Sequence, residues 1–144
     1  MHRNADASGL NTFVTLLSTG GTLEQVKSFL TSSAEYLQAR GGGTNNGFLA
    51  ALYQDALSRS PDAGGLATFT QALNRGVSRQ QVAAAVFASP EYLRDLVASL
   101  YQLYLKRAAD DGGLNGFVAS LGSGVPDQEV ISAMLGSDEF FAHV

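Results

Sequence analysis

The sequence predicts an all-α fold: a helical repeat domain of about eight short helices in three A–B–C units, the first of which lacks helix A. Three observations predict it. A motif of Arg, Asp, Gly, Leu and Phe recurs three times at constant spacing. Apolar residues between the motifs follow helical spacing, and no segment alternates apolar and polar residues as a half-buried strand does. The repeated positions are Arg3, Asp6 and Gly9, then Arg59, Asp62 and Gly65, then Arg107, Asp110 and Gly113.

Helix A is expected immediately before the motif in copies two and three. Its apolar residues recur at intervals of three and four positions, which places them on one face of a helix. They are Leu49, Leu52, Tyr53, Ala56 and Leu57 in copy two, and Val97, Leu100, Tyr101, Tyr104 and Leu105 in copy three. We therefore expect the tyrosines of these two stripes to lie in the core.

Helix B is expected to begin after the motif Asp and to end at a glycine suited to a left-handed cap. Its apolar positions are Leu10, Phe13 and Leu17, then Leu66, Phe69 and Leu73, then Leu114, Phe117 and Leu121; the closing glycines are Gly20, Gly76 and Gly124. Helix C follows. Capping boxes are predicted for Thr22 with Gln25 and for Ser78 with Gln81. In copy three, either Asp127 caps this helix or Pro126 fills its first position.

Each copy closes on Ser-x-Glu-aromatic, which predicts the start of a further helix. Serine is a favoured N-cap, and Glu in the first turn is stabilised by the helix dipole. We expect the aromatic residue to pack one repeat against the next. The three segments are 33–36, 89–92 and 137–140, with Tyr36, Tyr92 and Phe140 as the aromatic residues.

The chain is predicted to be a single domain, residues 1–144, with repeats of unequal length. Arg59 and Arg107 are 48 positions apart, whereas Arg3 and Arg59 are 56 apart. The additional residues include a Gly- and Asn-rich segment that we expect to be a flexible insertion, preceded by a short helical turn at Ala34–Gln38. The predicted boundaries are 3–40 for repeat one, 41–47 for the insertion, 48–92 for repeat two and 93–144 for repeat three.

Composition excludes several classes of protein. The net charge is −4 and the nine basic residues are scattered, so no nucleic-acid partner is expected. The absence of cysteine excludes disulfides and thiol catalysis. No apolar run approaches the roughly 20 residues of a membrane-spanning helix, and the first residues lack the apolar core of a signal peptide. Because copy one starts at Arg3 without helix A, we expect the chain to be part of a longer protein.

The sequence lacks the residue patterns typical of an enzyme. His2 and His143 stand near opposite ends of the chain, and no serine lies in a nucleophile elbow. The segment 41–47 lacks the Lys-Ser/Thr of a phosphate loop. Asp110 and Asp111 are adjacent carboxylates without the Asp-x-Asp-x-Asp-Gly spacing of a calcium loop. We therefore predict no catalytic residue, no cofactor and no metal site, with calcium as the minor alternative, here or in neighbouring domains.

The Arg-x-x-Asp pair admits two interpretations. Structurally, Arg59 lies where helix A ends, Asp62 caps helix B, and the two charges can pair across the turn. Functionally, an Arg and an Asp together could hold a sugar hydroxyl or a carboxylate. Recurrence in three copies favours the structural interpretation. Gly65 lies in the first turn of helix B, where glycine is unfavourable, and we expect it to allow a close approach of helices rather than contact with a ligand.

One extended pattern covers helix A, the motif and the closing Ser-Pro-Glu-Tyr. In copy two it comprises Leu52, Tyr53, Leu57, Arg59, Asp62, Gly65, Leu66, Phe69, Gly76, Val82, Ser89, Pro90, Glu91 and Tyr92. The pattern resembles the bacterial repeat family catalogued as domain of unknown function 4214, which is distantly similar to the helical repeats of phycobilisome linker polypeptides. Its copies span nearly the whole chain, although Ala34 and Asp138 stand where copy two has Pro90.

The resemblance implies an all-α module within a large exported or surface-attached bacterial protein, often beside calcium-binding glycine-rich repeats. It brings no catalytic residue. Some surface-layer proteins carry similar helical repeats in a segment that holds lipopolysaccharide. A secreted or cell-surface location is therefore expected from the resemblance.

We expect a non-enzymatic module for structural scaffolding, adhesion or surface attachment, whose partners are neighbouring domains or further copies of itself. The alternative is a carbohydrate-binding module that anchors its parent protein to surface glycan or lipopolysaccharide through polar residues in the grooves between helices. These residues include Asn11, Thr12, Asn74 and Asn115. The incomplete repeats leave apolar faces at both ends. Either Phe140, Phe141 and Val144 fold back over repeat one, or the faces pair with another molecule or domain.

Overall fold

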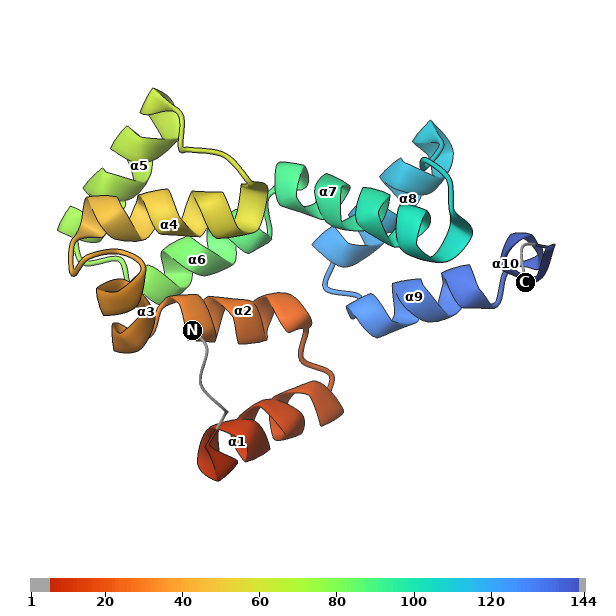
Figure 1. Cartoon of the computed structure of the whole chain (residues 1–144), viewed down its shortest axis with the longest axis horizontal. Coiled ribbons are helices and arrows are strands. Elements are labelled where there is room, and N and C mark those ends of the chain that lie inside the picture. The colour runs from red at the N-terminus through yellow and green to blue at the C-terminus, as the bar shows by residue number, and fades with distance from the viewer. Residues whose placement is uncertain (1–5, 143–144) are drawn as a thin grey trace.

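The computed structural model of the chain describes residues 6–142, which contain ten α-helices, one π-helical turn and no strand. The all-α prediction is confirmed (Figure 1). The helices are α1 (Ala7–Ser18), α2 (Leu23–Thr31), α3 (Ala34–Ala39), α4 (Asn45–Leu57), α5 (Ala63–Asn74), α6 (Arg79–Phe87), α7 (Pro90–Leu100), α8 (Asp111–Gly122), α9 (Asp127–Leu135) and α10 (Asp138–Ala142), and the π-helical turn η1 (Tyr101–Leu105) continues α7.

The described residues form ten α-helices where about eight were expected, and two of them are the short helices α3 and α10, which begin at the closing Ser-x-Glu segments as predicted. Ser33 caps α3, where its side chain accepts a hydrogen bond from the Tyr36 backbone N–H. The equivalent bond at Ser137 comes from the Phe140 N–H and begins α10. Helices A, B and C are then α4, α5 and α6 in repeat two, and α7 with η1, α8 and α9 in repeat three. Repeat one contributes α1 and α2 as its B and C helices.

Most helix ends lie where the sequence predicts them. Thr22 and Ser78 form complete capping boxes with the glutamines three residues later. Gly76, which follows α5, has φ +92°, a left-handed conformation that glycine adopts without steric cost. Neither alternative for repeat three is correct. Pro126 is the N-cap of α9 in an extended conformation and supplies no side-chain cap bond, and Asp127 is the first helical residue.

The segment 41–47, expected to be a flexible insertion, is partly helical, because Thr44 caps α4 through the Gly47 N–H and α4 already begins at Asn45. The remaining turn is tightly packed. A Cβ atom at Gly41 would lie 2.8 Å from the Phe48 backbone nitrogen, so this turn requires glycine. The insertion thus divides one helix A into two pieces, α3 and α4, which correspond to the continuous α7 and η1 of the next repeat.

The core is formed where helix A lies across helices B and C. In repeat two, α4 contacts α5 and α6, and it buries Phe48, Leu49 and Leu52 completely. Helix α2 packs along α6, which joins repeats one and two, and α7 leads to a second lobe with α8 and α9 (Figure 1). Tyr53 and Tyr101 are buried and Tyr104 is half-buried, as expected for tyrosines in the helix A stripes.

The C-terminal segment does not fold back over repeat one. Helix α10 packs against α9 and η1 at the far end of the second lobe, well away from α1 (Figure 1). Phe140 packs against the core, whereas Phe141 remains 70% exposed. The fold-back alternative is therefore wrong for the described residues, which do not include Val144.

Candidate functional site

The motif residues form one cluster that occurs twice, at the turn between helices A and B of repeats two and three. We call it the arginine cluster. Its members are Tyr53, Arg59, Asp62, Gly65 and Glu91 in repeat two, and Tyr101, Arg107, Asp110, Gly113 and Glu139 in repeat three. Arg3 lies outside the described residues, so the cluster of repeat one is represented only by Asp6 and Gly9.

A left-handed residue ends each helix A and positions the arginine. Ser58 has φ 54° and Lys106 has φ 56°, a conformation that costs energy for any residue with a side chain. The left-handed residue reverses the direction of the chain, so that the side chain of the following arginine lies back over the end of helix A. The Arg59 guanidinium carbon lies 5.3 Å from the centre of the Tyr53 ring, and that of Arg107 lies 5.0 Å from the Tyr101 ring, both within cation–π range.

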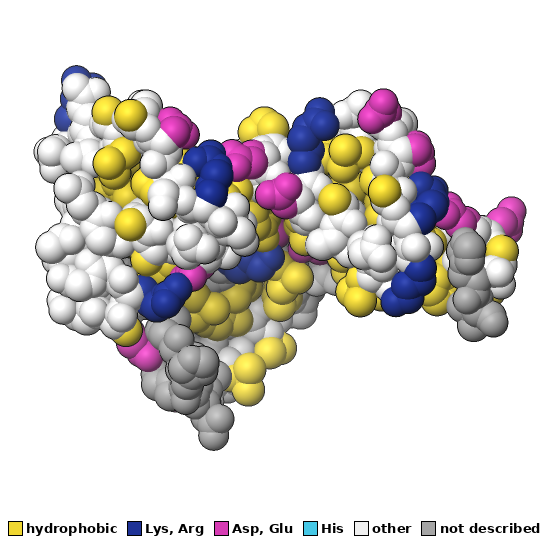
Figure 2. Space-filling view, turned by 45° about the horizontal axis from the view of Figure 1, so that its top comes forward, with side chains coloured by type: hydrophobic (Ala, Val, Ile, Leu, Met, Phe, Trp, Pro, Cys, Tyr) yellow, Lys and Arg dark blue, Asp and Glu magenta, His cyan; other side chains and the backbone are white. Residues whose placement is uncertain are grey.

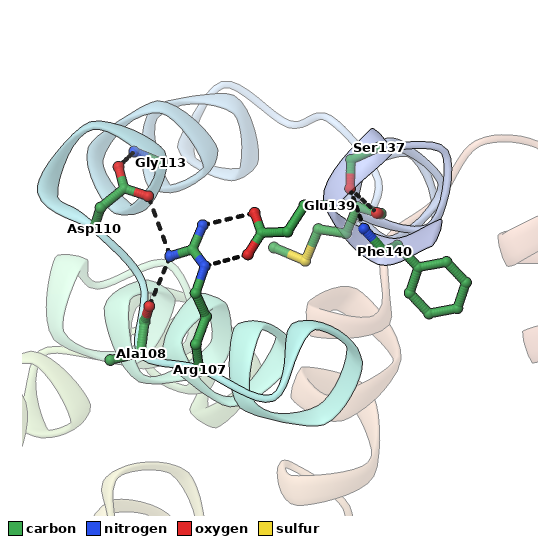
Figure 3. Close-up of polar contacts among 8 residues, drawn as sticks. Arg107, Ala108, Asp110, Gly113, Ser137, Glu139 and Phe140 are labelled. Carbon is green, nitrogen blue, oxygen red and sulfur yellow. Dashed lines mark hydrogen bonds and ion pairs between the residues drawn. The ribbon is translucent and has the colours of Figure 1, made fainter. Parts of the chain in front are cut away.

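The main partner of each arginine is the Glu of the closing Ser-x-Glu segment. Arg59 donates from Nε and Nη2 to the two carboxylate oxygens of Glu91, at 2.5 and 2.7 Å. Arg107 holds Glu139 in the same bidentate manner, with 2.8 Å from Nη2 to Oε2 (Figure 3). These hydrogen bonds lower the pKa of the Glu91 carboxyl and raise the pKa of Arg59. Each pair therefore connects the end of one helix A to the start of the next.

Sequence reasoning did not pair these arginines with the glutamates, although the sequence carries a signal. Arg59 and Glu91 are 32 positions apart, and so are Arg107 and Glu139. Arg3 and Glu35 have the same separation in the sequence. A constant separation between opposite charges in every copy is the pattern expected of a contact that the repeat reproduces.

The motif Asp has the expected role as N-cap of helix B. Its side chain accepts a hydrogen bond from the glycine N–H three residues later, at 2.7 Å for Asp6, 2.8 Å for Asp62 and 2.9 Å for Asp110. This bond lowers the pKa of Asp62 and of Asp110. The expected Arg–Asp contact is present but secondary, at 3.6 Å for Arg59 with Asp62 and 3.3 Å for Arg107 with Asp110.

The motif glycine is explained by the tyrosine of helix A. A Cβ atom on Gly65 would lie 2.6 Å from the Tyr53 hydroxyl oxygen, and one on Gly113 would overlap the Tyr101 hydroxyl. The tyrosine rings are held in place by edge-on contact with a phenylalanine of helix B, 6.3 Å between centres for Tyr53 and Phe69. The expected close approach of helices therefore occurs between the tyrosine tip and the first turn of helix B.

The arginine cluster connects consecutive helices through contacts within the chain. Each arginine is bound by the Glu of the closing Ser-x-Glu segment and by the motif Asp, and its Nη1 also donates to a backbone carbonyl, that of Ser60 at 3.0 Å and of Ala108 at 2.8 Å. Its ring contact further restricts its movement. Most of its donors are thus already used within the protein, which favours the structural interpretation over a ligand site.

A second polar cluster lies between repeats one and three and was not anticipated. Lys27 donates to the Tyr92 hydroxyl and forms an ion pair with Glu24 at 3.4 Å. Tyr92 in turn donates to Glu24 at 3.4 Å. Asp127 is only 2% exposed, and its Oδ1 has no hydrogen-bond partner among the described residues. Burial and the nearby Glu24 carboxyl raise the pKa of Asp127 to about 6.

A shallow groove of about 550 Å³ follows α5 beside the start of α4. Its polar lining comes from Asn46, Thr70, Gln71, Asn74 and Arg75.

The groove contains only one of the four polar residues that were expected to contact sugars. Asn74 lies within it, whereas Asn115 accepts a hydrogen bond from Arg94 at 3.0 Å. Asn11 and Thr12 are exposed on α1, in another part of the molecule. The structure therefore does not bring the four together.

Within residues 6–142, no three His, Cys, Asp or Glu side chains are grouped as a metal site would require. Asp111 is exposed in the first turn of α8 beside the cap residue Asp110. His2 and His143 lie outside the described residues. In the same part of the chain, every helix is too short or too polar to span a bilayer.

Comparison with known proteins agrees with the repeated architecture. Residues 27–96 and 93–144 each match the family described as "Domain of unknown function (DUF4214)". The two matches together cover most of the chain and meet near the start of α7. Searches of curated proteins and of solved structures give no match.

Proposed function

We propose that this chain, which belongs to the family described as domain of unknown function DUF4214, is a non-enzymatic helical repeat module of a larger exported or cell-surface bacterial protein. It acts in structural scaffolding, adhesion or surface attachment. Its partners are neighbouring domains or further copies of itself. The location follows from the resemblance of the repeat to modules of exported bacterial proteins.

The bidentate Arg–Glu pair is the observation that carries this proposal. Arg59 with Glu91 and Arg107 with Glu139 tie each helix A to the next helix A. The recurring polar residues are thus used to set the orientation of consecutive repeats. A chain of units held at fixed orientation suits a spacer or a scaffold, whose task is to keep its two ends a constant distance apart.

Single-molecule energy transfer between α1 and α9 tests this function. The chain contains no cysteine, so Ser8→Cys and Ser132→Cys, both at exposed positions, provide specific labelling sites. A scaffold gives one narrow distribution of distances. Arg59→Ala with Arg107→Ala should broaden it, whereas Arg75→Ala, at an exposed arginine outside the arginine cluster, should not. A broad distribution in the parent chain would contradict the scaffold function.

A carbohydrate-binding module is the second candidate, and the groove along α5 favours it. Amide, hydroxyl and guanidinium groups line a shallow surface together with the apolar Leu66, a combination that suits sugar rings. A glycan array tests this candidate. The array is probed with the parent chain, with the double variant Gln71→Ala/Asn74→Ala, and with Asn115→Ala as a control outside the groove. Binding that only the double variant loses would support this candidate. Absence of binding to any glycan would reject it.

A further inference from the structure

Repeat one exposes an apolar face, most positions of which are covered in the other two repeats. The face lies on α1 and α2, and we call it the α1–α2 face. Its most exposed side chains are Leu10 at 53%, Val14 at 55%, Phe29 at 44% and Leu30 at 41%. Helix α1 buries none of its residues within the part of the chain that the structure describes. In Figure 2, hydrophobic side chains are visible on the lower lobe, where α1 lies.

Equivalent positions in repeats two and three identify what covers such a face. Leu30 corresponds to Val86, which is 3% exposed, and to Met134, which is 2% exposed. Leu10 corresponds to Leu66 and Leu114, which pack against the core. In both repeats helix A covers these positions, since α4 contacts α5 and α6, while α7 contacts α8 and η1 contacts α9.

Gly9 gives independent evidence that a helix A covers this face. Glycine is disfavoured in the first turn of a helix, and in repeats two and three the tyrosine hydroxyl of helix A explains it. Among the described residues, the three atoms nearest to a Cβ atom at Gly9 all belong to the Asp6 side chain, the closest at 3.3 Å. Repeat one thus has the glycine that faces a tyrosine hydroxyl in the other repeats, but no tyrosine of the chain is among the atoms nearest to it.

We propose that the α1–α2 face binds the helix A of an adjoining repeat unit, an amphipathic helix with the pattern Leu-Tyr-x-x-x-Leu. The tyrosine hydroxyl lies over Gly9, and the leucines cover Leu10 and Leu30. This inference rests on the proposed scaffold function and names the partner that extends the array. The docked helix repeats the contacts that α4 makes with α5 and α6.

The chain itself does not supply this helix. Leu52 of α4 and Val97 of α7 are completely buried in their own repeats, so a second copy has no free helix A to offer. Helix α10 is engaged with α9 and η1 and contains neither a leucine nor a tyrosine. The occupant is therefore a helix from outside these three repeats.

A labelled peptide comprising residues 90–105 provides the probe, because it carries Leu100, Tyr101 and Leu105 in the required pattern. Fluorescence anisotropy measures its binding to the intact 144-residue chain. We expect saturable binding, and binding at least about tenfold weaker for a peptide with Tyr101→Ala and Leu105→Ala.

Chain variants locate the site. Gly9→Ala should leave the chain folded and place a methyl group where the tyrosine hydroxyl would lie, and Leu30→Asp places a charge on the face; each should weaken binding about tenfold or more. Leu103→Asp, at a leucine that is 56% exposed on η1, is the matched control and should bind as the parent chain does. Circular dichroism of each variant confirms that it remains folded.

Two results would overturn the inference. One is the absence of saturable binding to the folded parent chain, or binding that Gly9→Ala and Leu30→Asp leave unchanged. The other is sedimentation that reveals a dimer of the parent chain which Leu30→Asp dissociates, since the face would then belong to a second copy. Neither result changes the distance distribution between α1 and α9, so failure here is distinguishable from failure of the scaffold function.

Discussion

Arg59 and Glu91 are 32 positions apart and share two hydrogen bonds of 2.5 and 2.7 Å, which join the end of helix A in repeat two to the start of helix A in repeat three. Arg107 and Glu139 reproduce this relationship one repeat later. Both partners of the first pair are partly exposed, at 38% and 44%, so solvent screens the attraction. The fork geometry nevertheless fixes orientation, because two parallel hydrogen bonds allow only one arrangement of the guanidinium and the carboxylate.

Glu91→Gln and Arg59→Gln should each lower the melting temperature, and the double variant should lose less than the sum of the two. The physical reason is that the first substitution already breaks the pair, so the second removes only the remaining minor contacts. Thermal unfolding followed by circular dichroism measures the change in melting temperature of the two single variants and of the double variant. Glu129→Gln, at an exposed position on α9, is the control and should change little. Strictly additive losses would show that the two residues are not coupled.

Asp62→Ala should lower the melting temperature without affecting any binding activity of the chain. Alanine removes the acceptor for the Gly65 N–H at the start of α5, whereas Asp62→Asn retains a good N-cap and should lose much less. Asp6→Ala and Asp110→Ala should behave alike, because each carboxylate accepts the equivalent bond. A binding defect at unchanged stability would instead assign the Asp to a ligand.

Gly65→Ala and Gly9→Ala should change stability in opposite directions. At Gly65 the new methyl group would lie 2.6 Å from the hydroxyl of the buried Tyr53, and such overpacking typically costs about 1–3 kcal/mol. At Gly9 the nearest atom belongs to the exposed side chain of Asp6, which can move by a few tenths of an ångström, so the higher helix propensity of alanine should stabilise the chain by up to about 1 kcal/mol. Urea denaturation measures both free energies of unfolding.

Removal of the tyrosine hydroxyl provides the control for this pair of variants. Tyr53→Phe in the Gly65→Ala background should recover part of the lost stability, since the atom nearest to the new methyl group is then absent. The prediction fails if Gly65→Ala is neutral, or if Tyr53→Phe lowers the stability equally in both backgrounds.

The helices and their caps could be predicted from the sequence because they depend on local chemistry. Apolar spacing sets the buried face of each helix, and a side chain such as Ser78 caps the helix that follows it directly. The threefold recurrence strengthens the prediction, because a helix predicted in one copy must also be compatible with the aligned residues of the other two copies. Even the short helices α3 and α10, which contain few residues, begin where the Ser-x-Glu segments predict a helix start.

The contacts between repeats could not be predicted in the same way. Arg59 had Asp62 as an obvious neighbour in sequence, and only the return of the chain after α6 brings Glu91 closer. The burial of Asp127 is equally non-local, because it depends on α2 of repeat one lying near α9 of repeat three. A carboxylate in the first turn of a helix usually faces water, and the sequence gives no sign that this one does not.

Asp127 gives the chain a pH-dependent stability whose sign follows from its raised pKa. Burial and the nearby Glu24 carboxyl raise the pKa from the ordinary 3.8 to about 6, while Lys27 opposes the shift. The folded state therefore holds this proton more tightly than the unfolded chain does. The associated stability is present below about pH 4 and is lost as the pH rises through about 6.

Asp127→Asn should therefore raise the melting temperature at about pH 7.5 and have much less effect at about pH 4, since asparagine resembles the protonated carboxyl. Thermal unfolding at a series of pH values, with the parent chain measured beside each variant, isolates this contribution from the carboxylates that lose stability in acid, such as Glu91. Asp111→Asn is the matched control, because Asp111 is also the first residue of its helix but is exposed. A variant that is stabilised equally at both pH values, or an Asp111→Asn profile with the same shape, would show that the buried carboxyl is not the source of the pH dependence.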